Sequence, residues 1–197
     1  MIENLILIRH LKTDAPVQGA FYGSTDLAIE KADYKSFDFS PEKVYTSPMK
    51  RCLQTVDIYF PRVSKQTVND ARECDFGEWE GKTFAEIADG YPAEVEAWKN
   101  DEDFAFPSGE KVKNFAKRVN GMAGELISNN EKNLFLVTHA GVIRFLICHF
   151  LNISIDKFLS FDVDPGSFTA LKVFGQGSGS IHKLNSTGDQ SWLKSLL

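Results

Sequence analysis

The sequence predicts an α/β fold, a three-layer α/β/α sandwich in which helices cover both faces of a mostly parallel sheet. Short apolar runs that suit buried strands, such as residues 5–8 and 134–137, alternate with longer stretches of helical periodicity. This alternation is typical of parallel sheets flanked by helices. The chain has 197 residues, 43% of them hydrophobic, which is enough to bury one substantial core. We therefore expect a single domain over residues 1–197.

In the first half of the chain, the expected strands are short and the connections are long. Ser47 and Pro48 mark the start of a helix, because serine can cap a helix and proline suits its first turn. The expected elements are a strand at 4–8, a loop over 11–26, a strand at 43–46, a helix over 48–59 and a strand at 63–68.

The second half begins with an aromatic and acidic segment, residues 77–108, which we expect to lie as an excursion over one edge of the sheet. Two short helical pieces are expected within it, at 83–88 and 92–99. A long helix over 110–128 follows, because its apolar residues recur at helical spacing. The remaining expected elements are a strand at 134–137, a helix at 141–151 and strands at 167–173 and 180–184.

Composition and charge argue against several classes of protein. The net charge of −5 disfavours a nucleic-acid or membrane-surface partner, although a few focused cations can still hold a small anion. No apolar stretch is long enough to span a bilayer, and Glu3 interrupts the N-terminal run before it resembles a signal peptide. Cys52, Cys74 and Cys148 are widely separated and odd in number, which favours reduced thiols in the cytoplasm.

Polar residues follow two of the apolar strands directly. Arg9 and His10 come after the run at 5–8, and His139 comes one residue beyond the run at 134–137. In open α/β sheets, ligands bind in the crevice at the carboxyl ends of the strands. We therefore expect these side chains to share one site.

Two arginines, two histidines and one glutamate match the requirements of phosphoryl transfer. Arginine carries a planar fork that pairs with two phosphate oxygens, so Arg9 and Arg51 are the candidate phosphate-binding cations. A neutral imidazole is nucleophilic near pH 7, and His10 is the candidate nucleophile. We expect His139 to donate to a phosphate oxygen and Glu73 to protonate the leaving alkoxide. No two His or Cys residues show metal-ligand spacing, so neither a metal nor another cofactor is expected.

Four segments in a fixed order carry a resemblance to a known family. They are Arg9-His10-Leu11, Ser47-Pro48-Met49-Lys50-Arg51, Glu73 with the following Asp75-Phe76-Gly77-Glu78-Trp79-Glu80-Gly81, and Thr138-His139-Ala140-Gly141-Val142-Ile143-Arg144. The chain resembles the histidine phosphatase superfamily, the phosphoglycerate-mutase-like proteins, over essentially its whole length. The resemblance implies the phosphoglycerate-mutase-like form of the α/β fold, a phosphohistidine intermediate and the roles given above to the five side chains.

A narrower resemblance, to the α-ribazole phosphatases of cobalamin nucleotide-loop assembly, rests on residues 22–26, 106–110 and 141–144. Two positions depart from the family pattern. Leu11 replaces a glycine that contributes backbone freedom rather than a reacting group. Pro16 replaces an asparagine that helps to hold the phosphate, so the site is expected to lack one donor. The family's helix between its first two strands is expected to be reduced, since only residues 26–37 are available for it.

These observations predict a cytosolic, metal-independent phosphomonoesterase that acts on a small phosphorylated metabolite, with α-ribazole 5′-phosphate as one candidate. A cofactor-dependent phosphoglycerate mutase is one alternative, although such mutases carry longer insertions around the acid and a longer C-terminal tail. A catalytically inactive binding protein of the same fold is the other, although His10, Glu73 and His139 are all present. The natural substrate and the oligomeric state stay open.

Several residues near the predicted acid have two interpretations. Core positions are favoured for four aromatic residues, and the alternative is that some of them line the leaving-group side of the pocket. These residues are Trp79, Trp98, Phe104 and Phe106. Cys74 is interpreted as a packing residue, because it has no base of its own.

Overall fold

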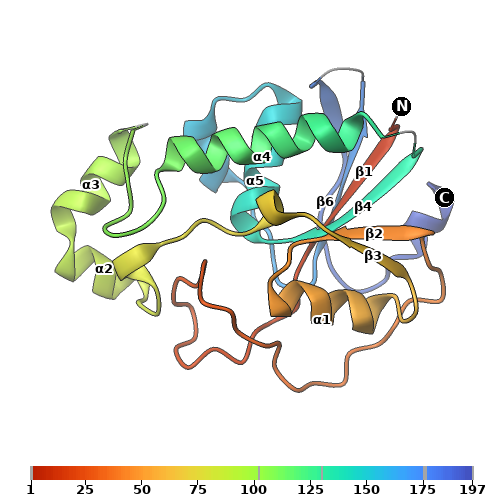
Figure 1. Ribbon diagram of the computed structural model, residues 1–197, viewed down its shortest axis with the longest axis horizontal. Coiled ribbons are helices and arrows are strands. Elements are labelled where there is room, and N and C mark those ends of the chain that lie inside the picture. The colour runs from red at the N-terminus through yellow and green to blue at the C-terminus, as the bar shows by residue number, and fades with distance from the viewer. Residues whose placement is uncertain (1, 102, 130, 175–176, 197) are drawn as a thin grey trace.

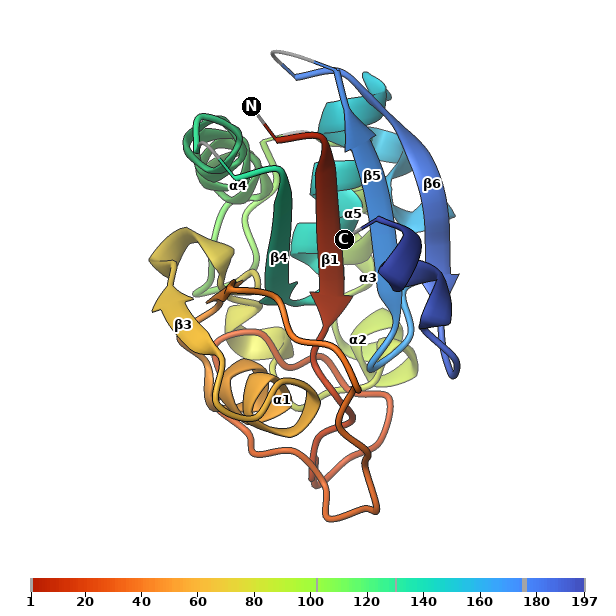
Figure 2. The same cartoon turned by 90° about the vertical axis from the view of Figure 1, so that its right-hand side faces the viewer.

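The computed structural model describes residues 2–101, 103–129, 131–174 and 177–196, and these form a six-stranded sheet with the order β3-β2-β4-β1-β5-β6 (Figure 1). The strands are β1 (Asn4–Arg9), β2 (Lys43–Thr46), β3 (Ser64–Thr67), β4 (Asn133–Thr138), β5 (Phe168–Val173) and β6 (Gly179–Ser186). Strands β3, β2, β4 and β1 run parallel, whereas β5 and β6 extend the sheet in antiparallel pairing (Figure 2). The predicted mostly parallel α/β sheet is confirmed.

Helices lie on both faces of this sheet, with α4 and α5 on one side and α1 on the other (Figure 1). Helices α2 and α3 project beyond the sheet on the side of α4. The helices are α1 (Lys50–Tyr59), α2 (Phe84–Gly90), α3 (Pro92–Asn100), α4 (Val112–Ile127) and α5 (Ala140–Leu151), with 3-10 turns at Asn69–Ala71, Gly77–Trp79, Ile155–Ser160 and Ser191–Ser195.

The alternation of side chains along β1 divides the core into two layers. Leu5 and Leu7 pack into the cluster that includes α4 and α5, and Ile6 and Ile8 pack into the cluster under α1. Successive side chains of a strand point to opposite faces, so a strand covered on both faces must be apolar throughout. This explains why the run before Arg9 is continuous rather than alternating.

The register of the parallel strands brings three carboxyl ends to one edge. Arg9 of β1 pairs with Thr138 of β4, and Thr46 of β2 pairs with Val137 of β4. The residues that follow these strands therefore emerge side by side. The first residue after β1, β2 and β4 is His10, Ser47 and His139, respectively.

Two helix starts differ from the sequence prediction. Helix α1 begins at Lys50 rather than Pro48, and its N-cap, Met49, makes no side-chain cap. The Lys50 N–H instead donates to Asp26 Oδ1 at 2.7 Å, whereas the Ser47 hydroxyl contacts His139 Nε2 and accepts from Met49 N, one residue before the helix. Helix α4 begins two residues later than predicted, since Glu110 is held by Arg118.

Residues 26–37 contain no helix, in keeping with the expected reduction of that element. Within the described ranges, we find no helix that is both long and apolar enough to cross a membrane.

Candidate active site

A cavity of about 400 Å³ opens at the carboxyl edge of the parallel strands. Four of the five predicted site residues line it, namely Arg9, His10, Arg51 and Glu73. The fifth, His139, is fully buried beside His10, and their ring centroids are 5.2 Å apart at an interplanar angle of 61°. The structure thus brings together residues that are up to 130 positions apart in the chain.

His10 is oriented by a backbone carbonyl. Its Nδ1 lies 2.7 Å from the Leu11 carbonyl oxygen, which can only accept, so Nδ1 carries the proton. The lone pair is therefore on Nε2, which makes no hydrogen bond within the described residues. Burial, reinforced by the positive charges of Arg51 and Arg9, holds the pKa of His10 well below its usual 6.5. The ring is neutral, and its free nitrogen is available to a ligand.

His139 is held at both ring nitrogens. Arg51 Nε donates to Nδ1 at 3.2 Å, so Nε2 carries the proton and donates to Ser47 Oγ at 2.9 Å. Burial, followed by the positive charge of Arg51, keeps the pKa of His139 well below 6.5. Before His139 can donate to a phosphate from Nδ1, Arg51 Nε must leave that atom, the ring proton must move from Nε2 to Nδ1, and the Ser47 hydroxyl must then donate to Nε2. The serine hydroxyl can do this because it both donates and accepts.

Arg51, only 1% exposed, is anchored by carbonyl oxygens. Its Nη1 donates to Thr25 O at 2.8 Å and its Nη2 to Gly23 O at 2.7 Å. A guanidinium has five N–H groups, and three are used here, counting the bond to His139. Two N–H groups and the whole positive charge are left for a ligand in the cavity.

Arg9 lines the same cavity and carries an unsatisfied donor. Its Nη1 donates to the Val163 carbonyl, whereas its buried Nε has no partner among the described residues. Burial lowers the pKa of Arg9 from its usual value, although Glu73 opposes the shift. A buried donor without a partner is unfavourable, and an anion in the cavity would relieve it.

Glu73 is fixed by two backbone N–H groups. Its Oε2 accepts from Gly141 N at 2.9 Å, at the start of α5, and its Oε1 accepts from Cys74 N at 3.1 Å. A Cβ at position 141 would lie 2.3 Å from Glu73 Oε1, so only glycine leaves room for the carboxylate. Gly141, in the His139 motif, therefore makes room for the Glu73 carboxylate and also lies in the first turn of α5.

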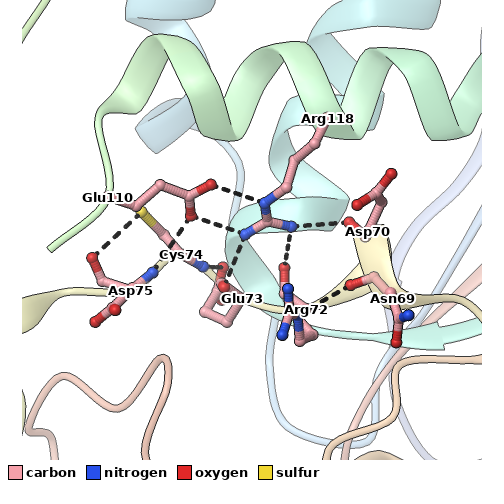
Figure 3. A network of polar contacts seen from close by, with 8 residues as sticks. All are labelled: Asn69, Asp70, Arg72, Glu73, Cys74, Asp75, Glu110 and Arg118. Carbon is pink, nitrogen blue, oxygen red and sulfur yellow. Dashed lines mark hydrogen bonds and ion pairs between the residues drawn. The ribbon is translucent and has the colours of Figure 1, made fainter.

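A network around Arg118 holds the backbone of Glu73 (Figure 3). Arg118 pairs with both carboxylate oxygens of Glu110, at 2.8 and 2.9 Å, and its Nη2 also donates to Glu73 O at 2.9 Å. Its Nη1 reaches the carbonyls of Asp70 and Arg72. Arg118 therefore ties α4 to the segment that carries the acid. No short motif marks it in the sequence, because its contacts with the segment that carries Glu73 are to backbone oxygens.

A second group of cavity-lining residues is aromatic, and we call it the aromatic end. The rings come from the 77–108 segment, from α4 and α5, and from the loops around them: Phe21, Phe76, Trp98, Phe106, Phe115, Phe145 and Phe158 line the wall. Trp79 is instead buried in the core next to Phe104. Of the four aromatic residues with two interpretations, Trp79 and Phe104 are core residues, Trp98 lines the cavity, and Phe106 both belongs to the core and lines the cavity.

The neighbouring thiols are poor nucleophiles. Burial raises the pKa of Cys52 to about 12, and burial with the nearby Glu110 and Glu73 carboxylates raises the pKa of Cys74 above its usual value. Arg144, from the His139 motif, also lines the cavity, which sequence reasoning did not anticipate. Among the residues that the structure describes, no group of three His, Cys, Asp or Glu side chains is placed to hold a metal ion.

Comparisons with known proteins place this site in a class. Residues 5–187 match the model of the histidine phosphatase superfamily (branch 1), and the chain belongs to this superfamily. It is 25% identical to phosphoserine phosphatase 1 of Hydrogenobacter thermophilus over 195 residues, which cover 93% of this chain and 92% of that protein.

Solved structures show the same fold. An Escherichia coli structure matches with a TM-score of 0.82 at 23% identity, covering 96% of this chain and all of that one. The α-ribazole phosphatase of Shigella flexneri matches with a TM-score of 0.78 at 25% identity, covering 95% of this chain and 100% of its own. The predicted phosphoglycerate-mutase-like fold and the predicted family are confirmed, and the chain is a phosphatase.

Proposed function

We propose that this phosphatase hydrolyses a phosphate monoester whose alcohol carries a bulky aromatic group, through a phosphohistidine at His10. The neutral His10 ring carries the proposal, since its free Nε2 borders a cavity that also holds two arginines and a carboxylate. Arg9 and Arg51 are assigned to the phosphate oxygens. The buried, unpartnered Nε of Arg9 and the two spare N–H groups of Arg51 support this assignment.

In the first step, the Nε2 lone pair attacks phosphorus and the bond from phosphorus to the leaving oxygen breaks. Glu73 gives its proton to that oxygen, so the alcohol departs neutral. The new positive charge on the His10 ring is stabilised by the hydrogen bond from Nδ1 to the Leu11 carbonyl, at 2.7 Å.

In the second step, water attacks phosphorus and the phosphorus–nitrogen bond breaks. Glu73 takes a proton from the water, which restores both the acid and the neutral ring. His139, once Arg51 Nε has turned from its Nδ1 to the phosphate, is assigned to a non-bridging oxygen. The backbone donors from Gly141 and Cys74 hold the Glu73 carboxylate in place between the two steps.

The aromatic wall supports α-ribazole 5′-phosphate as the candidate substrate. This compound joins a planar aromatic base to a ribose phosphate, and a wall that includes Trp98, Phe106 and Phe158 suits such a base. The similarity to the Shigella flexneri enzyme and the segments 22–26, 106–110 and 141–144 point the same way. The three cysteines are unpaired and buried, which supports a reducing compartment such as the cytoplasm.

A panel of substrates tests this proposal. Release of inorganic phosphate would be followed with α-ribazole 5′-phosphate, phosphoserine, 3-phosphoglycerate and p-nitrophenyl phosphate. We expect kcat/KM for α-ribazole 5′-phosphate to exceed that for phosphoserine by about tenfold or more, which corresponds to about 1.4 kcal/mol of transition-state binding. A preference for phosphoserine would refute the proposal that the substrate alcohol carries an aromatic group. Conversion of 3-phosphoglycerate to 2-phosphoglycerate faster than its hydrolysis would favour the mutase.

A further inference from the structure

The phosphate-facing Arg51 has no ion-pair partner in the described part of the chain, although it is buried. Its guanidinium is anchored on the carbonyls of Gly23 and Thr25 and on the ring of His139. A buried cation needs compensation. A carboxylate placed directly on Arg51 would supply it, but would also cancel the charge that a phosphate requires.

The missing carboxylate lies on the other side of the loop that holds Arg51. Glu80 accepts hydrogen bonds from three consecutive N–H groups, those of Gly23 at 2.8 Å, Ser24 at 2.9 Å and Thr25 at 3.2 Å. It also accepts from Thr25 Oγ1 at 2.6 Å and from Phe76 N at 3.3 Å. The carboxylate therefore organises the whole 23–25 segment.

One peptide group connects the two charges. The Gly23 carbonyl, which accepts from Arg51, and the Ser24 N–H, which donates to Glu80, belong to the same trans peptide and point in opposite directions. A peptide bonded to a cation at its oxygen and to an anion at its N–H is polarised in both bonds, and each strengthens the other.

Two further contacts fix the position of this segment. A Cβ on Gly23 would lie 1.7 Å from the Cys74 carbonyl oxygen, so the loop is in direct contact with the segment that carries Glu73. The adjacent Asp26 accepts from Lys50 N, next to Arg51 in the chain. A shift of the loop would therefore move both anchors of the guanidinium.

We propose that Glu80 is a positioning residue that orients Arg51 toward the phosphate through the Gly23–Ser24 peptide. The negative charge of Glu80 compensates the positive charge of Arg51 without direct contact, so the guanidinium stays free for the ligand. This inference rests on the assignment of Arg51 to the phosphate in the proposed function.

A double-mutant cycle with the full chain tests the coupling. Glu80→Gln keeps the shape but removes the charge, and it would be measured alone and in an Arg51→Met background. Glu78→Gln, on the same 3-10 turn, is the matched control, since Glu78 contacts Ser108 Oγ and the Tyr91 hydroxyl instead. The readouts are kcat/KM with p-nitrophenyl phosphate and the inhibition constant of inorganic phosphate. A thermal melt checks that each variant folds, and Arg51→Lys replaces Arg51→Met where the latter does not.

With Arg51 present, we expect Glu80→Gln to weaken phosphate inhibition and kcat/KM by about tenfold each, or about 1.4 kcal/mol. Without Arg51, the same change should have an effect of less than about twofold, and Glu78→Gln should have none. Equal losses in both backgrounds would reduce Glu80 to a stabiliser of the loop and overturn this inference alone. Unchanged phosphate inhibition in Arg51→Met would instead contradict the phosphate contact of the proposed function, and the inference with it.

Discussion

We call the five candidate residues the cationic end of the site: Arg9, His10, Arg51, Glu73 and His139. Each of them ends or follows a strand, starts a helix or is tied to a helix start. At the aromatic end, the wall is assembled from α3, α4, α5 and loops that are far apart in the chain. His10 and His139 are held by the register of β1 and β4, which the core determines. Trp98 and Phe158 come from a short helix and a 3-10 turn, and their rings pack edge-on against each other.

The two ends differ in what they are expected to control: the cationic end carries out the reaction, and the aromatic end selects the substrate. The cationic end depends on backbone donors, carbonyls and strand register, so its geometry tolerates little change. The aromatic end depends on ring packing, which accepts other apolar side chains at modest loss of free energy. Changes at the cationic end should therefore affect all substrates alike, and changes at the aromatic end should discriminate between leaving groups.

Replacement of the nucleophile should produce the largest effect. His10→Gln keeps the volume but removes the lone pair on Nε2, and we expect at least about a 10³-fold loss of kcat with every substrate. Steady-state assays and rapid-quench detection of an acid-labile phosphoenzyme would measure it. His182→Gln, at an exposed position of β6, is the control. A phosphoenzyme that persists in His10→Gln would move the nucleophile to another residue.

Glu73 is assigned to protonate the leaving oxygen, so the effect of replacing it should depend on the leaving group. Glu73→Gln cannot deliver a proton, and we expect a loss of about 10²-fold or more with an alkyl phosphate such as ribose 5-phosphate. The loss with p-nitrophenyl phosphate should be clearly smaller, since nitrophenolate leaves without a proton. Parallel steady-state measurements of both substrates decide the matter. Equal losses would show that Glu73 only positions the phosphate.

The sequence alone predicted most of the cationic end and little of what supports it. Arg9, His10 and His139 could be placed because apolar strands and polar strand ends have a clear pattern. Ser47 was wrongly assigned to a helix cap, because the same hydroxyl can serve a histidine that is distant in the chain. Glu80 and Arg118 were missed as organisers, since most of their partners are backbone groups of other segments. The pattern of residues along the sequence does not predict contacts with backbone groups of distant segments.

The buried neutral histidines should make stability depend on pH. Burial and Arg51 hold the pKa of His10 and of His139 well below 6.5, so the unfolded chain takes up protons first as the pH falls. The contribution of these histidines to the free energy of unfolding should be complete above pH 6.5. Below that pH it should decrease, by up to about 1.4 kcal/mol per pH unit for each histidine.

Urea denaturation at about pH 7.5 and pH 5.5 would measure this dependence, with His139→Gln expected to show a weaker decrease than the parent chain. The exposed His182→Gln should retain the full decrease. An unchanged decrease in His139→Gln would mean that folding does not lower the pKa of His139.

The smallest effect should come from the aromatic end, and it should be selective. Trp98 is half-buried, lines the cavity and contacts Phe106 and Phe158 edge-on or tilted. Trp98→Leu removes one ring face, which is worth about 0.5–1.5 kcal/mol. We therefore expect kcat/KM to fall about three- to tenfold for an aromatic ester such as α-naphthyl phosphate, and to change by less than about twofold for glycerol phosphate. Phe84→Leu, at an exposed site on α2, is the matched control and should alter neither. An equal loss with both esters would mean that the aromatic wall supports the cationic end, and that the two ends of the cavity are not independent.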